Sequence, residues 1–116
     1  MSTSTLRIPA QTEQVRVARL VAGSAARRAG VVEDDVEDVR LAVGEAVGRA
    51  VVRHLHSEVS DPVVIEFVDA AEFFTVVVHD RADNSLPDNE FTMAVIKGLA
   101  PKSVLDEHTV SLTWYL

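Results

Sequence analysis

Apolar residues recur every three or four positions along two stretches of the chain, a period that predicts amphipathic helices with one buried face. The longer stretch runs from Val36 to His54. The acidic residues Glu33 to Asp35 precede it, where a helix N-terminus favours negative charge. Its predicted buried stripe is Val36, Val39, Val43, Ala46 or Val47, Ala50 and Val51. We therefore expect a helix from Glu33 to about His54 at the centre of the fold.

The other helix, predicted from Thr12 to about Ala29, is rich in alanine. Thr12 is a possible N-cap, and Gly30 stands where a helix C-terminus often needs a left-handed residue. The predicted buried stripe is Val15, Ala18, Ala22, Ala25 and Ala29. Side chains this small indicate close packing against a neighbouring element. Arg16 and Arg19 lie at the border of the stripe.

β-branched and aromatic residues fill shorter stretches that predict strands. The predicted strands are Thr5 to Pro9, Val63 to Val68, Phe73 to His79, Lys102 to Leu105 and Thr109 to Leu116. Only four residues separate the second strand from the third, which indicates a hairpin. In the last strand one face is predicted to carry Val110, Leu112, Trp114 and Leu116.

A loop dense in Asp, Asn and Pro, from Asp80 to Glu90, leads into a short predicted helix from Phe91 to Leu99. The element order is then strand, two helices, two strands, short helix, two strands. Helices on one face of a mixed, mostly antiparallel sheet make an α+β two-layer sandwich. A length of 116 residues predicts one domain over residues 1–116.

The composition narrows the class of protein. A net charge of −7 argues against a nucleic-acid partner, and it fits either a protein partner with some basic surface or plain solubility. The chain has no Cys, which excludes disulfides and Cys-based zinc sites. The start MSTSTLRIPA lacks the apolar core of a secretory signal, and no apolar run approaches the ~20 residues of a membrane span. We expect a cytoplasmic protein without a membrane anchor.

The central helix carries a motif that resembles the GHKL ATPases and, more narrowly, the small anti-sigma-factor serine kinases of bacteria. That family has Glu-Ala-x-x-Asn-Ala, usually followed a turn later by His. The stretch GEAVGRAVVRH matches at Glu45, Ala46, Ala50 and His54 and departs at Arg49, which stands in place of the Asn. The resemblance covers nearly the whole chain and implies a GHKL (Bergerat) type sandwich.

Two further motifs of the family are degenerate in this chain. A strand that ends in Asp-x-Gly-x-Gly corresponds to VVVHDRADN, which keeps Asp80 but has Ala82 and Asn84 in place of the glycines. The family's glycine-rich lid has no counterpart, because no glycine lies between Asp80 and Phe91. The resemblance is therefore to a degenerate member.

The resemblance implies a role for each matching residue. In an intact member the Glu is the general base, the Asn helps to hold Mg²⁺, and the Asp receives the adenine amino group. These roles point to Glu45 as the catalytic position and Asp80 as the cofactor-binding position. In anti-sigma members an Arg on the first helix contacts partner proteins; Arg19 matches that position, and we group Arg16 with it.

The departures weaken the predicted chemistry. Arg49 offers only N–H donors and a fixed positive charge, so it cannot ligate Mg²⁺. It stands one turn after Glu45, which predicts an i,i+4 ion pair that makes Glu45 a weaker base; direct contact of Arg49 with a phosphate is the alternative. The side chain of Asn84 would crowd the phosphates of a nucleotide, and the flanking Asp83 and Asp88 would repel them with charge of the same sign. Asp80 could bind adenine or simply begin a loop.

The four histidines show no metal-ligand spacing, so no metal site is predicted. His54 and His56 stand two apart at the end of the central helix, where only one of them can face a given site. We interpret His54 as a cation at the helix C-terminus rather than as a ligand.

Three functions remain open. The first is a regulatory module that binds a sigma factor, its anti-anti-sigma antagonist, or both, with nucleotide binding and kinase activity lost and no cofactor. The second is an active serine kinase that uses ATP and Mg²⁺ to phosphorylate an anti-anti-sigma factor. The third is a domain that dimerises through its alanine-rich first helix. A homodimer is expected under the first reading as well, because family members commonly dimerise.

Overall fold

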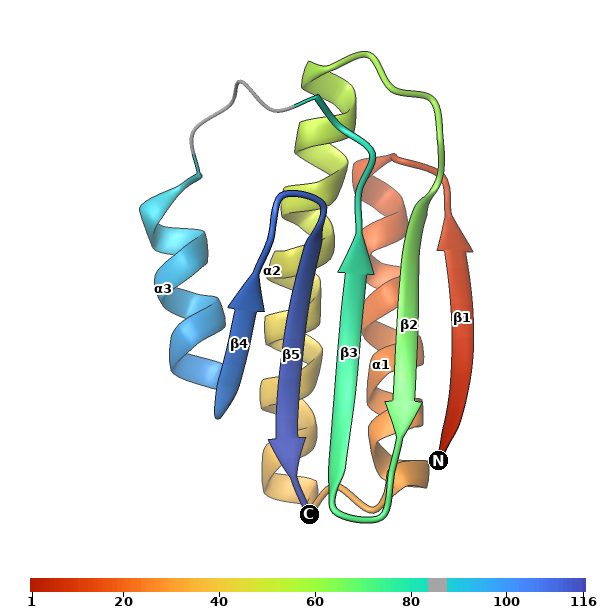
Figure 1. Ribbon diagram of the computed structural model, residues 1–116, viewed down its shortest axis with the longest axis vertical. Coiled ribbons are helices and arrows are strands. Elements are labelled where there is room, and N and C mark those ends of the chain that lie inside the picture. The colour runs from red at the N-terminus through yellow and green to blue at the C-terminus, as the bar shows by residue number, and fades with distance from the viewer. Residues whose placement is uncertain (84–87) are drawn as a thin grey trace.

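The computed structural model describes residues 1–83 and 88–116 and places five strands in one sheet (Figure 1). The strands are β1 (Ser2–Ile8), β2 (Val63–Asp69), β3 (Phe73–His79), β4 (Lys102–Leu105) and β5 (Thr109–Tyr115). Their order across the sheet is β1-β2-β3-β5-β4, and every pairing among the described residues is antiparallel. The predicted hairpins β2–β3 and β4–β5 are both present.

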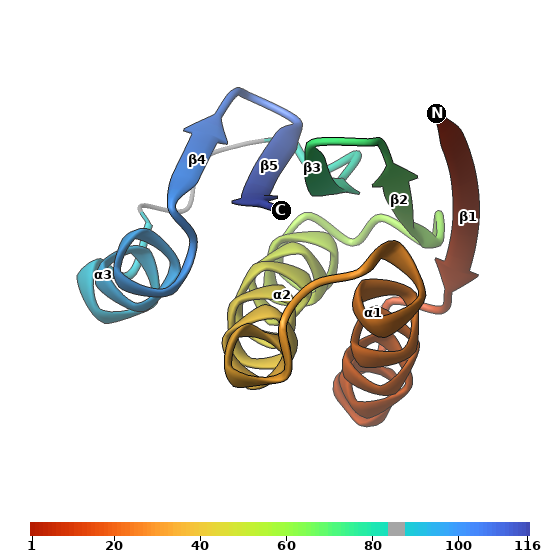
Figure 2. The same ribbon diagram turned by 90° about the horizontal axis from the view of Figure 1, so that it is seen from below.

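All the helices cover one face of this sheet, which leaves the other face uncovered (Figure 2). They are a 3₁₀ turn η1 (Thr12–Gln14) and the α-helices α1 (Val15–Ala29), α2 (Glu33–His56) and α3 (Glu90–Leu99). Helix α2 is the longest element, and it packs against both α1 and α3. The predicted α+β two-layer sandwich is confirmed, and α2 is its central helix.

The core lies between α2 and the inward face of the sheet. Strand alternation turns Ile65, Val76 and Leu112 toward the helices, where they are fully buried. Every position of the stripe predicted for α2 is buried as well. Trp114 closes the core at one end, where its indole N–H donates to the carbonyl of Leu99 at the end of α3 (3.2 Å). Leu116, predicted on the same face as Trp114, lies beyond the end of β5 and is half exposed.

The alanines of α1 face α2 within the chain. Ala18, Ala22 and Ala26 are completely buried, whereas Ala25 and Ala29, which the stripe prediction included, are only half-buried. Alanine at the contact lets the two helix backbones approach closely, which explains the extensive α1–α2 contact. The alanine stripe is therefore used inside the fold and is not a free surface through which the chain could dimerise.

Two arginine stems cross the α1–α2 contact in reciprocal fashion. The aliphatic stem of Arg19 on α1 lies over Gly44 of α2, and that of Arg40 on α2 lies over Gly23 of α1. A Cβ built at Gly44 would meet Cδ of Arg19 at 2.6 Å, and one at Gly23 would meet Cδ of Arg40 at 2.9 Å. A side chain at either glycine would therefore have to displace an arginine stem.

The helix ends agree only partly with the sequence prediction. Gly30 ends α1 with φ +95°, the left-handed conformation that was expected. Thr12 is not an N-cap, because the chain makes a 3₁₀ turn at Thr12–Gln14 before α1 begins. At the other end of α1, Arg27 donates a hydrogen bond to Glu33 at the start of α2 (3.0 Å). This bond and the guanidinium charge lower the pKa of the Glu33 carboxyl below its ordinary value.

Strand β1 begins at Ser2, three residues earlier than predicted. Its register against β2 is unbroken from Ser2 opposite Asp69 to Ile8 opposite Val63, so backbone pairing extends the strand beyond its apolar part. No helix in the described ranges is both long enough and apolar enough to cross a membrane.

Candidate functional site

A pocket of about 300 Å³ opens between α2, the start of α3 and the turn before α1. Glu45, Arg49 and Arg53 stand at successive four-residue steps of α2, so their side chains share one face of the helix. The pocket is lined by Thr12, Glu45, Gly48, Arg49, Val52, Arg53, Asp88, Asn89 and Thr92. Its volume is at the lower limit of the ~300–1,000 Å³ that ligand sites in proteins occupy.

Asp80 is buried beside this pocket at the end of β3, with 2% of its side chain exposed. Arg53 grips the carboxylate with two N–H groups, Nε to Oδ2 at 3.2 Å and Nη2 to Oδ1 at 3.3 Å. The backbone N–H of Ala82 donates to Oδ1 at 3.0 Å, and Nδ1 of His108 lies 3.6 Å from the same oxygen. Both oxygens of Asp80 are thus occupied by the chain itself.

Arg53 is itself buried and makes a further hydrogen bond besides those to Asp80. Its side chain is 3% exposed, and its Nη2 also donates to the carbonyl of Glu107 in the β4–β5 turn (3.2 Å). Its Nη1 is buried, and none of the residues in the described ranges accepts a hydrogen bond from it. A charged side chain buried in this way is stable only as long as its partner carboxylate stays in place.

Arg49 makes a different ion pair from the one that the sequence predicted. Its Nε donates to Oδ1 of Asp88 at 2.7 Å, and its Nη1 lies 3.9 Å from Oδ2 of Asp80. No ion pair joins Arg49 to Glu45 in the part of the chain that the structure describes. The nearly buried guanidinium pairs with the carboxylates of Asp88 and Asp80 rather than with Glu45 one turn away, since an exposed i,i+4 pair contributes only ~0.3–0.5 kcal/mol.

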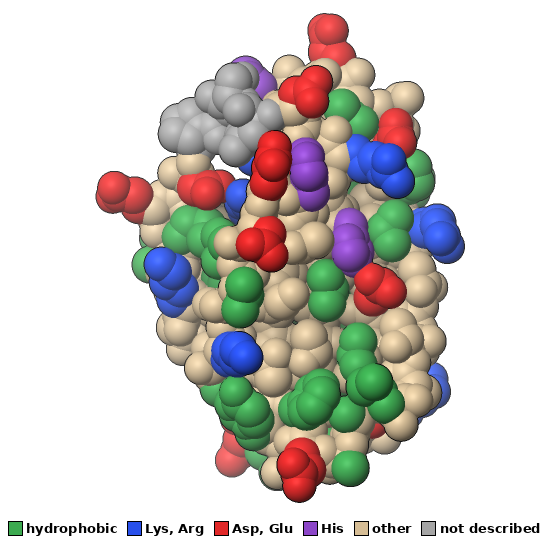
Figure 3. All heavy atoms as spheres, viewed as in Figure 1, with side chains coloured by type: hydrophobic (Ala, Val, Ile, Leu, Met, Phe, Trp, Pro, Cys, Tyr) green, Lys and Arg blue, Asp and Glu red, His purple; other side chains and the backbone are tan. Residues whose placement is uncertain are grey.

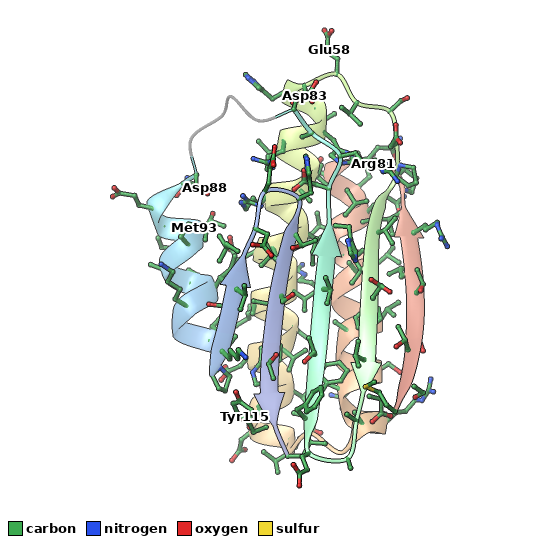
Figure 4. The ribbon with its side chains drawn as sticks, viewed as in Figure 1. Glu58, Arg81, Asp83, Asp88, Met93 and Tyr115 are labelled. Atoms are coloured by element: carbon green, nitrogen blue, oxygen red, sulfur yellow. The ribbon has the colours of Figure 1, made fainter. Side chains whose placement is uncertain are left out.

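The Arg49–Asp88 contact joins α2 to the segment that leads into α3. Asp88 lies directly before that helix, on the side that faces α2 (Figure 4). The next residue, Asn89, caps α3 by accepting from the N–H groups of Phe91 (2.8 Å) and Thr92 (3.3 Å). Asp88, which was predicted to repel a polyanion, thus lines the pocket and is paired with Arg49 there. The predicted role of Asn84 lies outside the described residues.

His54 is not the helix C-terminal cation that the sequence predicted. It is fully buried, with Nδ1 3.0 Å from the carbonyl of Asp61 and Nε2 accepting from the backbone N–H of Arg81 at 2.8 Å. A ring nitrogen that accepts carries no proton, so the imidazole is neutral and donates from Nδ1. His54 therefore joins the end of α2 to the segment before β2 and to the segment after β3.

Arg16 and Arg19 lie apart from the pocket lining, on the exposed side of α1. Arg19 is held along α2 by the contact of its stem with Gly44. Two apolar side chains, Val17 and Leu20, are exposed on the same helix by 40% and 53%. The combination of arginine and exposed apolar surface is typical of protein-binding sites.

The residues present do not fit a bound Mg²⁺. Mg²⁺ takes a near-octahedral shell of oxygen ligands, but the Asn position of the family is occupied by a guanidinium that has only N–H donors. Among the described residues, no three His, Asp or Glu side chains are arranged to hold a metal ion. Glu45 is the predicted site residue that lines the pocket with a carboxylate, and no arginine in the described ranges binds it.

Sequence reasoning missed Arg53, His108 and the pairing of Asp88. Arg53 follows Arg49 by four residues, and this spacing could have indicated a second cation on the site face of α2. His108 has no local signal, because only the β4–β5 turn brings it beside Asp80.

The chain is similar to proteins of known class. A sequence model described as histidine kinase-like ATPase domain matches residues 8–103. Serine-protein kinase RsbW of Bacillus velezensis is 35% identical over 88 residues, which cover 72% of this chain and 55% of that protein. Serine-protein kinase RsbW of Staphylococcus aureus is 35% identical over 81 residues, which cover 68% and 50%. The chain thus spans about half the length of these relatives.

A solved structure shares the fold. The crystal structure of the RsbU and RsbW domains of Rv1364c from Mycobacterium tuberculosis superposes with a TM-score of 0.72 at 18% identity, over 99% of this chain and 31% of that chain. At this level of identity the likeness concerns the fold alone.

Proposed function

This chain belongs to the histidine kinase-like ATPase domain family, and on that premise we propose that it is a partner-switching regulator without nucleotide turnover. It binds a sigma factor, its anti-anti-sigma antagonist, or both. The observation that carries the proposal is the state of Asp80, the position that receives adenine in intact members. Its carboxylate is already bound by Arg53 through two hydrogen bonds.

The adenine amino group is a poor competitor for Asp80. Hydrogen bonds between ionised groups are roughly twice as strong as those made by a neutral donor. Displacing Arg53 would also leave a buried guanidinium without its carboxylate, which costs about 3–5 kcal/mol. The Arg49–Asp88 pair adds a second obstacle, because it fixes a guanidinium at the position where the resemblance implies the Asn that helps to hold Mg²⁺.

The exposed side of α1 is the surface that we assign to partner binding. Arg16 and Arg19 supply positive charge on a chain whose net charge is −7, so they favour an acidic patch on the partner. The contact of the Arg19 stem with Gly44 restricts the side chain before binding. A side chain that is already ordered loses less entropy on association, which favours affinity.

Charge reversal at this surface tests the assignment. Arg19→Glu is expected to weaken binding to the sigma factor or antagonist by at least ~30-fold, because arginine anchors at interfaces contribute about 2 kcal/mol or more. The measurement is a pull-down from the source cell followed by titration of the captured partner. Arg28→Glu is the matched control, since Arg28 is exposed at the other end of α1 and should leave binding unchanged. Equal binding by wild type and Arg19→Glu would remove Arg19 from the interface.

An active serine kinase is the second candidate, and one observation favours it. Glu45, at the position of the general base, lines the pocket and has no arginine partner among the described residues. This candidate requires ATP and Mg²⁺ to bind and an anti-anti-sigma protein to be phosphorylated. Nucleotide binding therefore separates the two functions.

A further inference from the structure

On α2, the pocket is lined by a glycine that packing within the chain does not require. A Cβ built at Gly48 would meet no atom within 4 Å, whereas at Gly23 or Gly44 it would meet an arginine stem. Gly48 lies inside α2, where glycine is among the least favourable residues. Because Gly48 lines the pocket, a side chain at this position would take up pocket volume. The glycine therefore lets a ligand approach the backbone of α2.

The surfaces next to Gly48 suit an apolar group. Val52 stands one turn further along α2 and is 49% exposed although its side chain is apolar. Thr12 and Thr92, whose side chains each carry a methyl group, line the pocket from η1 and α3. Ligand sites in proteins are mostly apolar, with a few polar groups that fix the orientation of the ligand. A volume of about 300 Å³ fits a compact molecule of this kind.

The charges at the pocket are balanced except for one carboxylate. Arg49 is paired with Asp88 at 2.7 Å, and Arg53 is paired with the buried Asp80 at 3.2 Å. Glu45 is half-buried and has no arginine partner in the described ranges. Two arginines against three carboxylates leave one negative charge over, and that charge belongs to Glu45. The pocket thus favours a ligand with a single positive charge.

Other ionisable groups near the pocket leave this balance unchanged. Residues 84–87 have the sequence Asn-Ser-Leu-Pro, which contains no ionisable side chain. The stem of Arg19 lies over Gly44, and no ion pair in the described ranges joins this arginine to Glu45. His108 lies 3.6 Å from Asp80, but it lines the hollow on the uncovered side of the sheet. Glu45 therefore remains the carboxylate that a ligand can neutralise.

That hollow on the uncovered sheet face carries charges of both signs. Figure 3 shows acidic, basic and histidine side chains together on the upper half of this face. The hollow has a volume of about 630 Å³, and its lining includes Arg7, Arg81, Glu66 and Asp83. With both signs side by side, it does not select a ligand of one charge. The pocket beside α2 does, because one of its carboxylates is left without a cation.

We propose that the pocket beside α2 binds a small organic monocation, a compound with a compact apolar body and one ammonium group. The ammonium donates to Glu45, and the apolar body packs against Gly48 and Val52. An ammonium has only donors and an ionised carboxylate only acceptors, and hydrogen bonds between ionised groups are roughly twice as strong as neutral ones. The inference rests on the proposed function, since a pocket for ATP would have to favour a polyanion.

NMR titration of the ¹⁵N-labelled chain with phenethylammonium tests this inference. The backbone amides of Gly48 and Thr92 are expected to shift saturably with a Kd of about 1 mM, an affinity that so small a ligand can reach. Phenethyl alcohol has the same apolar body without the charge and should bind at least ~10-fold more weakly. Phenylacetate, which carries a negative charge, should cause no saturable shift.

Two variants test the two parts of the pocket separately. Glu45→Gln keeps the size of the side chain and should remove the preference for the amine over the alcohol. Gly48→Leu fills the pocket and should abolish the binding of both compounds. Gly98→Leu is the matched control, because its Cβ also meets no atom within 4 Å and Gly98 on α3 lies outside the pocket lining. Emission from the buried Trp114 shows that each variant is folded.

Several results would overturn the inference. These are a wild type without saturable shifts well above the expected Kd, phenylacetate that binds as well as the amine, and an amine preference that survives Glu45→Gln. Binding that Gly48→Leu leaves unchanged, or that Gly98→Leu abolishes equally, would also overturn it. ATP with Mg²⁺ is titrated in the same way. Saturable binding of ATP contradicts the proposed function itself, whereas failure of the amine alone contradicts only this inference.

Discussion

Replacing Arg53 by methionine is expected to lower the free energy of unfolding by about 3–5 kcal/mol. The variant removes the two N–H groups that bind the carboxylate of Asp80 and leaves it buried with only the more distant side chains of Arg49 (3.9 Å) and His108 (3.6 Å) beside it. It also removes the donor to the carbonyl of Glu107. Most domains of this size have only about 5–15 kcal/mol of stability, so the loss is a large fraction of the total. Urea denaturation followed by Trp114 fluorescence measures it.

A double variant shows whether the loss comes from the unpaired charge. Asp80→Asn with Arg53→Met removes both charges and leaves an oxygen that can accept from Ala82 N–H. It should be more stable than Arg53→Met alone, because replacing a whole buried ion pair often costs little. A loss below about 1 kcal/mol in Arg53→Met would show that Asp80 does not depend on Arg53.

The second large effect is expected at His54. His54→Phe keeps a ring in the buried site but leaves the N–H of Arg81 and the carbonyl of Asp61 without partners. Each polar group left without a partner costs about 1–3 kcal/mol, so the loss of both bonds should cost about 2–6 kcal/mol of stability. Denaturant unfolding gives the total, and hydrogen exchange at the Arg81 amide should quicken because its acceptor is gone.

His56 provides the control for this prediction. It lies two residues further along α2 and is exposed, so His56→Phe should change stability by less than about 0.5 kcal/mol. Equal losses in the two variants would mean that the effect comes from helix propensity at the end of α2 and not from the bonds of His54.

Much of the fold could be predicted from the sequence because local patterns decide it. The buried stripe of α2 follows from a helical period that no other structure can satisfy. The β2–β3 hairpin follows from two β-branched runs separated by four residues. Gly30 follows from the need for a left-handed residue after α1. Errors arose where pairing with a distant segment decided the outcome, as at the start of β1.

The site was harder to predict because its contacts are long-range. Arg53 and Asp80 are 27 residues apart in the chain, and Arg49 and Asp88 are 39 apart. The i,i+4 rule considers only the neighbour on the same helix, so it assigned Glu45 to Arg49. The rule for helix C-terminal cations likewise made His54 a cation, although the chain beyond α2 folds back over it and its ring accepts a backbone hydrogen bond. In both cases a partner from a distant segment outweighed a weak local preference.

These contacts bear on how the chain departs from its family. The sequence shows only that Arg49 and Ala82 replace residues that the intact motifs need. The structure adds that arginines of α2 are bound to Asp88 in the pocket lining and to Asp80 beside the pocket. Under the proposed function, nucleotide binding would thus require more than the intact motif residues, because Arg53 would also have to release Asp80.

Calorimetric titration with ATP and Mg²⁺ tests the central claim most directly. Wild-type chain, shown to be folded by Trp114 emission, is titrated with ATP and with ADP in the presence of Mg²⁺. Because Arg53 occupies Asp80 and Arg49 replaces the metal-binding Asn, we predict no saturable heat with either nucleotide. Binding with a micromolar Kd that is lost when Mg²⁺ is chelated would contradict the account and favour the active kinase.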